Sequence, residues 1–249
     1  KQLDLGKIRQ HSIKLLSAGT LASSLLLSSP NMLPLPVKAL PEKTMELLAG
    51  TGLVLPDNPQ TFLTEHLKNL LPEKVGPINP ENEKKIGILI EKLIGIRARA
   101  NLEGEHLNTS YGLIGAEQHL PRFPGDTVEE HDAFRESGIT PGLGAWGYFA
   151  NSRIGMRPDD ILREKYYVAV QTLYLSDWEK RLRYLVDWYK YRKVLVINPI
   201  TGQSVVAVVA DAGPAAWTGK HFGGSPEVMY ELGLHKGSRK GAVILFFVD

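Results

Sequence analysis

One carboxylate follows the most valine-rich segment of the chain. Asp211 comes just after the run from Val205 to Val209, and Gly213 and Pro214 follow it. A carboxyl group at the end of a buried strand is partly desolvated, which raises its pKa and suits it to general acid catalysis. The same position also suits an aspartate that starts a turn by accepting hydrogen bonds from nearby backbone N–H groups. The sequence therefore predicts Asp211 as a catalytic acid/base, with the turn-forming role as the alternative.

Aromatic and basic residues that could bind a substrate occur in two other segments. Trp217, Lys220 and His221 lie in the loop after the carboxylate, where an indole can stack on the face of a sugar ring or form a hydrophobic lid. Trp146 and Tyr148 belong to the segment GAWGYF, where they either line a groove or pack inside a barrel. We predict all five as substrate-binding residues.

Glu117 and His119 form a second candidate pair for acid–base chemistry. A single residue separates them, so on an extended segment both side chains point to the same side. They could exchange a proton, and we predict them as catalytic residues. They could also ligate a metal, but two ligands without a third are weak evidence for a metal site. We therefore predict no metal and no cofactor.

The charge pattern and the absence of cysteine exclude several classes of function. The chain has 29 basic and 27 acidic residues, closely interleaved, and a net charge of +2, which argues against nucleic-acid binding. Without cysteine there is no disulfide, thiolate nucleophile or cysteine-ligated zinc. With 249 residues, 43% of them hydrophobic, the chain can form one moderate domain with extra elements or two small domains.

The N-terminal segment has the pattern of an export signal. Lys7, Arg9 and Lys14 precede an apolar run over 15–29, and a proline-rich stretch follows. A positive region before a short apolar run is typical of a secretory signal or signal anchor, although an amphipathic or buried helix is the alternative. We assign residues 1–40 to a signal- or anchor-like segment with a linker. The expected location is the periplasm or cell envelope, with membrane anchoring through residues 7–29.

Residues 41–140 are predicted to form a small helical region followed by a structured loop. Helices are expected over 41–50, 58–71 and 79–95, because asparagine followed by proline opens the second and third of them and leucine or isoleucine recurs at helical spacing. Residues 95–104 alternate like a half-buried strand. The segment 108–126 is rich in glycine and ionisable residues without a clear period, and we predict a loop there.

Residues 141–249 change to a β pattern with a helical insertion over 176–191. The insertion has a predicted capping box at Ser176 and Glu179, and a short helix is expected after Ser225. Nearly continuous apolar runs indicate strands covered on both faces, as in a small closed barrel. The predicted strands are Ala145–Ala150, Lys165–Tyr174, Lys193–Asn198, Gln203–Ala210 and Ala242–Val248.

Three segments of this region resemble a known family. They are VLVINPITGQSVVAVVADAGP, SPEVMYELGL and GAVILFFVD, which resemble the double-psi β-barrel of rare lipoprotein A, related to expansins and some lytic transglycosylases. GAWGYF resembles the first strand of that family. The resemblance covers about the last 105 residues. It implies an α+β fold, in which a small helical region precedes a C-terminal six-stranded double-psi β-barrel.

The resemblance also implies a site and a chemistry. It places Asp211 at the open groove of the barrel, where relatives have a general acid. Glycoside hydrolases normally need two carboxylates, whereas a lytic transglycosylase can use one, because the sugar's own hydroxyl attacks and leaves an anhydro product. The chain departs from the family at Ala212, which replaces an arginine, at the end of the second strand, which lacks a histidine, and at Gly223 and Gly224, which replace Asp-Leu before Ser225.

The expected function is therefore that of a bacterial cell-envelope protein. It would bind peptidoglycan or a similar glycan, and could cleave it by lytic transglycosylase-like acid/base chemistry. The alternatives are a non-catalytic carbohydrate-binding module and a structural component of an envelope assembly, with other envelope proteins as partners. No nucleic acid is expected as a partner.

Overall fold

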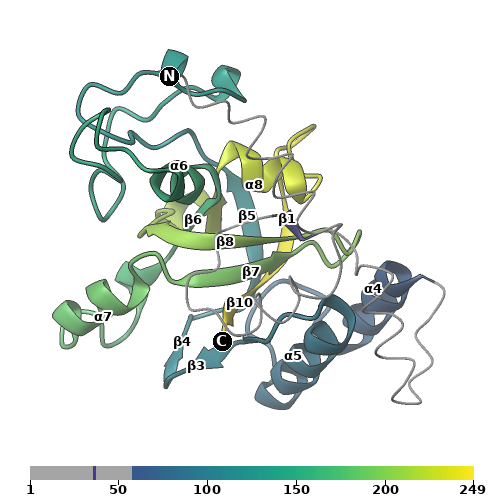
Figure 1. The fold of residues 1–249 in the computed structure, drawn as a ribbon. Coiled ribbons are helices and arrows are strands. Elements are labelled where there is room, and N and C mark those ends of the chain that lie inside the picture. The colour runs from purple at the N-terminus through teal and green to yellow at the C-terminus, as the bar shows by residue number, and fades with distance from the viewer. Residues whose placement is uncertain (1–35, 38–57) are drawn as a thin grey trace.

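A computed structural model describes residues 36–37 and 58–249 of the chain (Figure 1). The helix predicted over 41–50 and nearly all of the signal-like segment lie outside the described residues. In the described part, no helix is both long and apolar enough to cross a bilayer.

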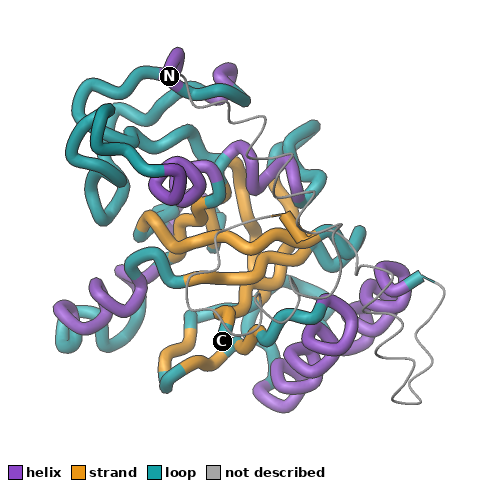
Figure 2. The backbone as a smooth tube through the Cα atoms, viewed as in Figure 1, coloured by secondary structure: helices purple, strands orange, loops and turns teal. Residues whose placement is uncertain are grey.

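Six strands close into a mixed β-barrel at the centre of the molecule (Figure 2). Around the barrel the order is β5–β10–β7–β8–β6–β9 and back to β5. The pairs β5–β9 and β6–β8 are parallel, and the other four pairs are antiparallel. The strands are β5 (Tyr111–Ala116), β6 (Tyr167–Val170), β7 (Lys193–Ile197), β8 (Ser204–Asp211), β9 (Phe222–Gly224) and β10 (Lys240–Val248). The predicted α+β class with a C-terminal six-stranded barrel is confirmed.

The strand pairing has an internal twofold pattern. If β5–β6–β7 is exchanged with β8–β9–β10, the parallel pair β5–β9 becomes the parallel pair β8–β6, and the antiparallel pair β5–β10 becomes β8–β7. The pairs β6–β9 and β7–β10 map onto themselves. The barrel is thus built from two topologically equivalent halves.

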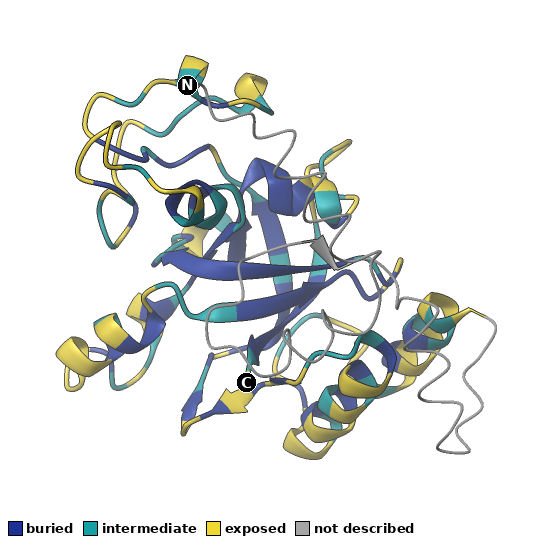
Figure 3. Cartoon of the chain, viewed as in Figure 1, coloured by how far each residue is buried: buried dark blue, intermediate teal, exposed yellow. Residues whose placement is uncertain are grey.

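Apolar side chains cover β7, β8 and β10 on both faces, which explains their continuous apolar runs. On β8, Val205, Ala207 and Val209 belong to one buried core, whereas Val206 belongs to a second core. The second core lies between the strands and the helices α4 (Pro59–Leu70) and α5 (Pro80–Ile94), whose inner faces are buried (Figure 3). The prediction that these strands are covered on both faces is confirmed.

Both helices begin where their asparagine caps predict, and α5 ends at the predicted glycine. Asn58 accepts hydrogen bonds from the backbone N–H groups of the first turn of α4 at 3.1 Å, and Asn79 does so for α5 at 2.8 Å. Gly95 ends α5 in the left-handed region, with φ of 76°. Both helices were predicted, and both are confirmed.

The remaining short elements surround the barrel. In α8, Ser225 caps the helix as predicted, whereas α7 begins at Leu182, so the capping box predicted at Ser176 and Glu179 is wrong. The strand predicted over 95–104 is split at Ala100 into two short strands, and Glu103 and Gly104, with φ of 54° and 90°, form the turn that follows the second of them. The elements are β1 (Pro36–Val37), β2 (Ala98–Arg99), β3 (Asn101–Leu102), β4 (Glu105–His106), α6 (Pro158–Lys165), α7 (Leu182–Tyr189), α8 (Pro226–Glu231) and single 3-10 turns at Val128–Glu130, Arg135–Ser137, Thr172–Tyr174 and Ala216–Thr218.

The first barrel strand is not where the sequence predicted it. Residues 145–150 form turns, and the strand is β5, inside the segment predicted to be a loop. Gly112 and Gly115 interrupt the apolar pattern of β5, and a Cβ on Gly112 would come 2.7 Å from the Cβ of His221. Glycine is therefore required where the chain from His221 onward packs on β5, and its presence concealed the strand.

Candidate functional site

Asp211 lies at the end of β8 and is held through one carboxylate oxygen. Its Oδ1 accepts hydrogen bonds from the backbone N–H of Ala145 at 3.0 Å and of Ala212 at 2.9 Å. Burial raises the pKa of Asp211, and these two hydrogen bonds partly oppose the rise. Within the described part of the chain, no hydrogen bond reaches Oδ2. The carboxyl group thus has one oxygen anchored to the turn and one available to a ligand.

A row of paired residues leads from Asp211 across three neighbouring strands. Asp211 pairs with Ala169 on β6, Ala169 with Gly223 on β9, and Gly223 with Gly115 on β5. The side chain of Glu117 lies over Gly223, because a Cβ there would come 2.5 Å from its Cγ and 2.6 Å from its Oε1. Gly223 is two strand spacings, about 10 Å, from Asp211. Glu117 therefore lies on the same part of the barrel as Asp211, without contacting it.

Glu117 forms an ion pair with Lys220 beside a small pocket. The Nζ of Lys220 lies 2.9 Å from Oε1 of Glu117, and both side chains are partly exposed. Arg239 and Lys240 contribute to the same pocket, whose volume is about 310 Å³. The pocket wall is thus rich in positive charge, with Glu117 as its acidic member.

The predicted aromatic and imidazole residues have different surroundings. Trp217 is 89% exposed on its 3-10 turn, and the neighbouring Ala216 N–H donates to the Oη of Tyr174, itself 47% exposed. His221 accepts a hydrogen bond at Nδ1 from the Leu113 N–H at 3.1 Å, and burial lowers its pKa. Exposed rings of Trp217 and Tyr174 therefore lie on the loops that border the turn after Asp211.

Trp146 and Tyr148 lie in the loop that supports Asp211. The Trp146 indole N–H donates to the carbonyl of Val186 at 2.9 Å and packs against the barrel core. Tyr148 is 38% exposed and follows Gly147, whose φ is 75°. Trp146 therefore anchors the segment whose Ala145 N–H reaches Asp211.

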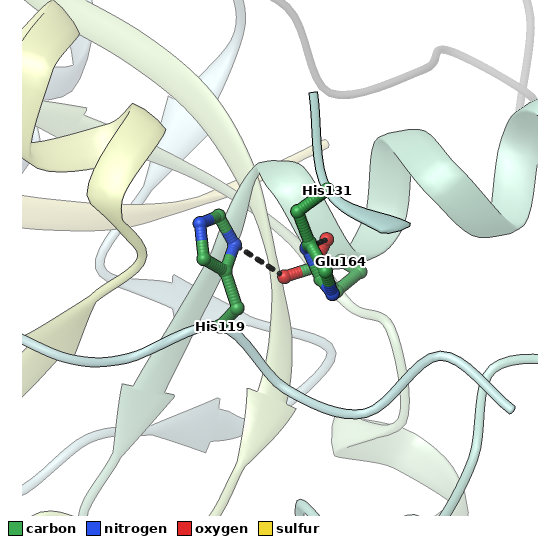
Figure 4. Close-up of side chains that lie close together, drawn as sticks. All are labelled: His119, His131 and Glu164. Carbon is green, nitrogen blue, oxygen red and sulfur yellow. Dashed lines mark hydrogen bonds and ion pairs between the residues drawn. The ribbon is translucent and has the colours of Figure 1, made fainter. Parts of the chain in front are cut away.

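His119 is completely buried away from the solvent and bonded to Glu164 (Figure 4). Its Nδ1 lies 3.0 Å from Oε1 of Glu164, and its Nε2 faces the carbonyl oxygens of Ala133 at 3.1 Å and Phe134 at 3.2 Å. No hydrogen bond joins His119 to Glu117 or Asp211 among the described residues. The structure thus places His119 in a separate buried cluster beneath the loop between β5 and α6.

Three more buried side chains complete this cluster around Glu164. Arg122 donates from Nε to Oε2 of Glu164 at 2.8 Å, and its Nη2 lies 2.7 Å from the same oxygen. Nδ1 of His131 lies 3.5 Å from Oε2, while its Nε2 lies 3.1 Å from Oδ2 of Asp126. His119, His131 and Glu164 each offer one ligand atom, all within 4.8 Å of one another, so these three residues could hold a metal ion.

Burial and charge shift the pKa values in and near the cluster. Burial disfavours ionised Glu164, but Arg122 and the two histidines outweigh it and hold its pKa far below the usual range. Burial also opposes the charged form of His131, yet the hydrogen bond to Asp126 and the negative charge of Glu164 raise its pKa. Glu227, at the start of α8, has its pKa raised to about 7 by burial and by the negative charge of Glu164. Glu227 thus belongs electrostatically to the cluster.

Sequence reasoning identified only His119 of this cluster. Arg122, Asp126 and His131 come from a loop without periodicity, and Glu164 comes from α6, whose alternating charges suggest a solvated helix. The available signal was density, because five histidine or carboxylate residues and an arginine occur within residues 119–131. Such density does not show which side chains are buried together.

The comparisons with known proteins add no relative. No protein-family model matches the sequence, and no curated protein is significantly similar to it. The barrel is therefore established by its strand pairing alone, and the geometry of the site is the observation that bears on the function.

Proposed function

We propose that the barrel is of the double-psi type and that the protein binds and lytically cleaves peptidoglycan or a similar β-linked glycan. The twofold strand pairing, with one parallel pair in each equivalent place, supports the barrel type. The observation that carries the function is Asp211, a partly buried acid whose Oδ2 receives no hydrogen bond from the described residues and whose pKa burial raises.

The proposed reaction needs one carboxyl group. Protonated Asp211 donates its proton to the glycosidic oxygen as the bond from that oxygen to the anomeric carbon breaks. A hydroxyl of the same sugar then attacks the anomeric carbon and returns its proton to Asp211. The products are one chain with a free hydroxyl and one with an anhydro ring, and no water is consumed. The Ala145 and Ala212 N–H groups stabilise the carboxylate between the two steps.

Glu117 supplies a carboxylate at a position where β9 itself has only a glycine. The family that the sequence resembles has an aspartate where this chain has Gly223, and the Glu117 side chain lies over that glycine. Lys220 orients Glu117 through its ion pair at 2.9 Å. We propose that Glu117 and Lys220 bind the polar groups of the glycan on this side of the barrel.

Trp217 and Tyr174 are proposed as the surface on which sugar rings stack. An indole that is 89% exposed loses hydrophobic stabilisation unless a ligand covers it, and the flat apolar face of a pyranose ring fits this requirement. A glycan passing Asp211 and lying on these rings would be an extended polysaccharide.

A non-catalytic glycan-binding module is the second candidate. Ala212 stands where the family that the sequence resembles has an arginine, and His221 uses Nδ1 to accept a backbone hydrogen bond. Both observations favour a site that has kept its shape and lost its chemistry. In both cases we propose an exported envelope protein, on the basis of the residues 7–29 pattern. As a module it would act beside other envelope proteins.

Incubation with purified peptidoglycan sacculi tests the proposal. The wild-type chain should pellet with the sacculi and release soluble anhydro-muropeptides that mass spectrometry detects. Asp211→Asn should pellet equally well and release at least 100-fold less product, since general acid catalysis contributes about 10²–10⁴-fold. Asp187→Asn, at an exposed position on α7, is the matched control and should behave as wild type. If the chain pellets but releases no product, the cleavage proposal is wrong and the non-catalytic glycan-binding module remains. If it does not pellet, both proposed functions are wrong.

A further inference from the structure

The buried cluster beneath the loop carries an inference independent of the glycan site. It consists of His119, Arg122, Asp126, His131 and Glu164, and none of these side chains lies on the proposed glycan surface. His119, His131 and Glu164 are each 0% exposed. Burying this many ionisable groups is costly unless their charges are closely matched.

In both histidines the Nε2 atom lies against an oxygen acceptor, as the non-ligating nitrogen of a metal-bound histidine does. Nε2 of His119 donates to the backbone carbonyls of Ala133 and Phe134, and Nε2 of His131 lies 3.1 Å from Oδ2 of Asp126. A ligating histidine almost always donates its other N–H to a carbonyl or a carboxylate, which fixes its tautomer. The two Nδ1 atoms are then left facing the same carboxylate. Figure 4 shows the contact between His119 and Glu164.

This arrangement brings hydrogen-bond acceptors together. With the proton on Nε2, neutral His119 has a bare Nδ1 that lies 3.0 Å from Oε1 of Glu164, and both atoms are acceptors. Nδ1 of His131 is buried, has no hydrogen-bond partner in the part of the chain that the structure describes, and lies 3.5 Å from Oε2. A positive charge is therefore needed between these atoms, either as protons or as a metal ion.

We propose that His119, His131 and Glu164 bind a divalent transition metal ion, zinc foremost, through the two Nδ1 atoms and Oε1. One ring nitrogen of each histidine and one oxygen of Glu164 lie within 4.8 Å of one another, and tetrahedral zinc at about 2.0–2.1 Å from each ligand separates ligands by about 3.3 Å. Imidazole and carboxylate ligands suit zinc and its neighbours in the first transition row. Arg122 bonds Oε2 of Glu164, which leaves Oε1 for the metal.

The charges of the surroundings also fit a dication. Asp126, Glu164 and Glu227 are carboxylates, and the Arg122 guanidinium is bonded to Glu164, so a doubly charged ion with neutral histidines brings the sum to zero when all three carboxylates are ionised. Among the described residues, neither carboxyl oxygen of Glu227 has a hydrogen-bond partner, although the side chain is buried. A nearby dication favours the ionised form of such a group. The ion would fasten the loop after β5 to α6, next to the Ala145 segment that holds Asp211.

Metal content and thermal unfolding of the full chain test the site. After EDTA treatment and dialysis against excess Zn²⁺, elemental analysis should find one zinc per chain. Zinc at about 100 times its dissociation constant should raise Tm by about 5–10 °C. Co²⁺ in place of zinc should give the intense visible absorption of a four- or five-coordinate nitrogen–oxygen site. No zinc retained, together with the same Tm in EDTA and in Zn²⁺, would overturn the proposal and leave protons as the bridging charge.

Variants decide which histidines hold the ion. His119→Gln and His131→Gln should each lose the bound metal and the zinc-induced rise of Tm, while His221→Gln, outside the cluster, should keep both. Circular dichroism in EDTA checks that the variants are folded. If the cluster variants are folded and still bind zinc as wild type does, the site lies elsewhere and the assignment is wrong. If they do not fold, the Co²⁺ spectrum of the wild-type chain remains decisive.

Discussion

At the scale of single residues, the position of Asp211 predicts how cleavage depends on pH. A general acid must be protonated in the free enzyme, and burial raises the pKa of Asp211 above its ordinary value of about 3.9. Activity should therefore be greatest below that raised pKa and fall as the pH increases through it. The pH profile of kcat/KM measures this value. A rate that is flat or that rises between about pH 4 and pH 8 would show that Asp211 is not the acid.

Trp217 should contribute to glycan affinity and almost nothing to stability. Its ring is 89% exposed, so Trp217→Ala removes little buried area. Loss of a stacking contact worth about 0.5–1.5 kcal/mol should weaken glycan binding about 2- to 10-fold, with Tm unchanged. Isothermal titration calorimetry with a soluble glycan fragment measures the affinity, and differential scanning calorimetry measures Tm. Unchanged affinity would remove Trp217 from the binding surface.

At the scale of elements, a histidine–carboxylate pair joins α5 to β4. His106 Nε2 lies 3.0 Å from Glu83, and this hydrogen bond raises the pKa of His106 although burial opposes the rise. Because the folded pKa is above the unfolded value of about 6.5, the pair stabilises the fold fully below about pH 6.5. That stabilisation is lost as the pH rises through the folded pKa.

Thermal unfolding at several pH values tests this link. Between about pH 6 and pH 8 the Tm difference between wild type and His106→Gln should shrink as the pH rises. His66→Gln, at an exposed position on α4, should show the same pH dependence as wild type. A difference between wild type and His106→Gln that stays constant or grows with pH would contradict the pairing.

Elements with a local signal could be predicted from the sequence, and those defined by distant neighbours could not. Asn58, Asn79 and Ser225 mark their helices because capping depends on a few adjacent residues. The valine run of β8 identifies a strand buried on both faces. By contrast, β5 has glycines at Gly112 and Gly115 because chain from another part of the sequence packs against them.

The same distinction applies to the candidate site. The end of β8 places Asp211 at a turn, which its sequence neighbours indicate, and its hydrogen bond to Oδ1 from Ala212 is local. The bond from Ala145 and the position of Glu117 over Gly223 depend on loop packing across the barrel. No periodicity in the loop between β5 and α6 reveals such contacts. The sequence therefore could not show that Glu117 lies over a barrel strand while His119 lies in the buried cluster.

At the scale of the whole molecule, the helices and the barrel share one core. Leu67 and Ile90 from the helices pack in the same buried cluster as Leu195, Val206 and Phe246 from the strands. The described part of the chain should therefore unfold in one cooperative step. Urea unfolding followed by far-UV circular dichroism and by tryptophan fluorescence should give coincident curves. Two separated transitions would show that α4 and α5 are stable without the barrel, or the barrel without them.

In the proposed function, the barrel cleaves a glycan with a single carboxyl group and without consuming water. The most direct measurement is mass spectrometry of products formed from peptidoglycan in water enriched in oxygen-18. Wild type should form anhydro sugar ends without the heavy isotope, and Asp211→Asn should form none. Heavy oxygen at the new reducing ends would show hydrolysis and a second catalytic carboxylate, and the absence of any new ends would show that this protein does not cleave the glycan.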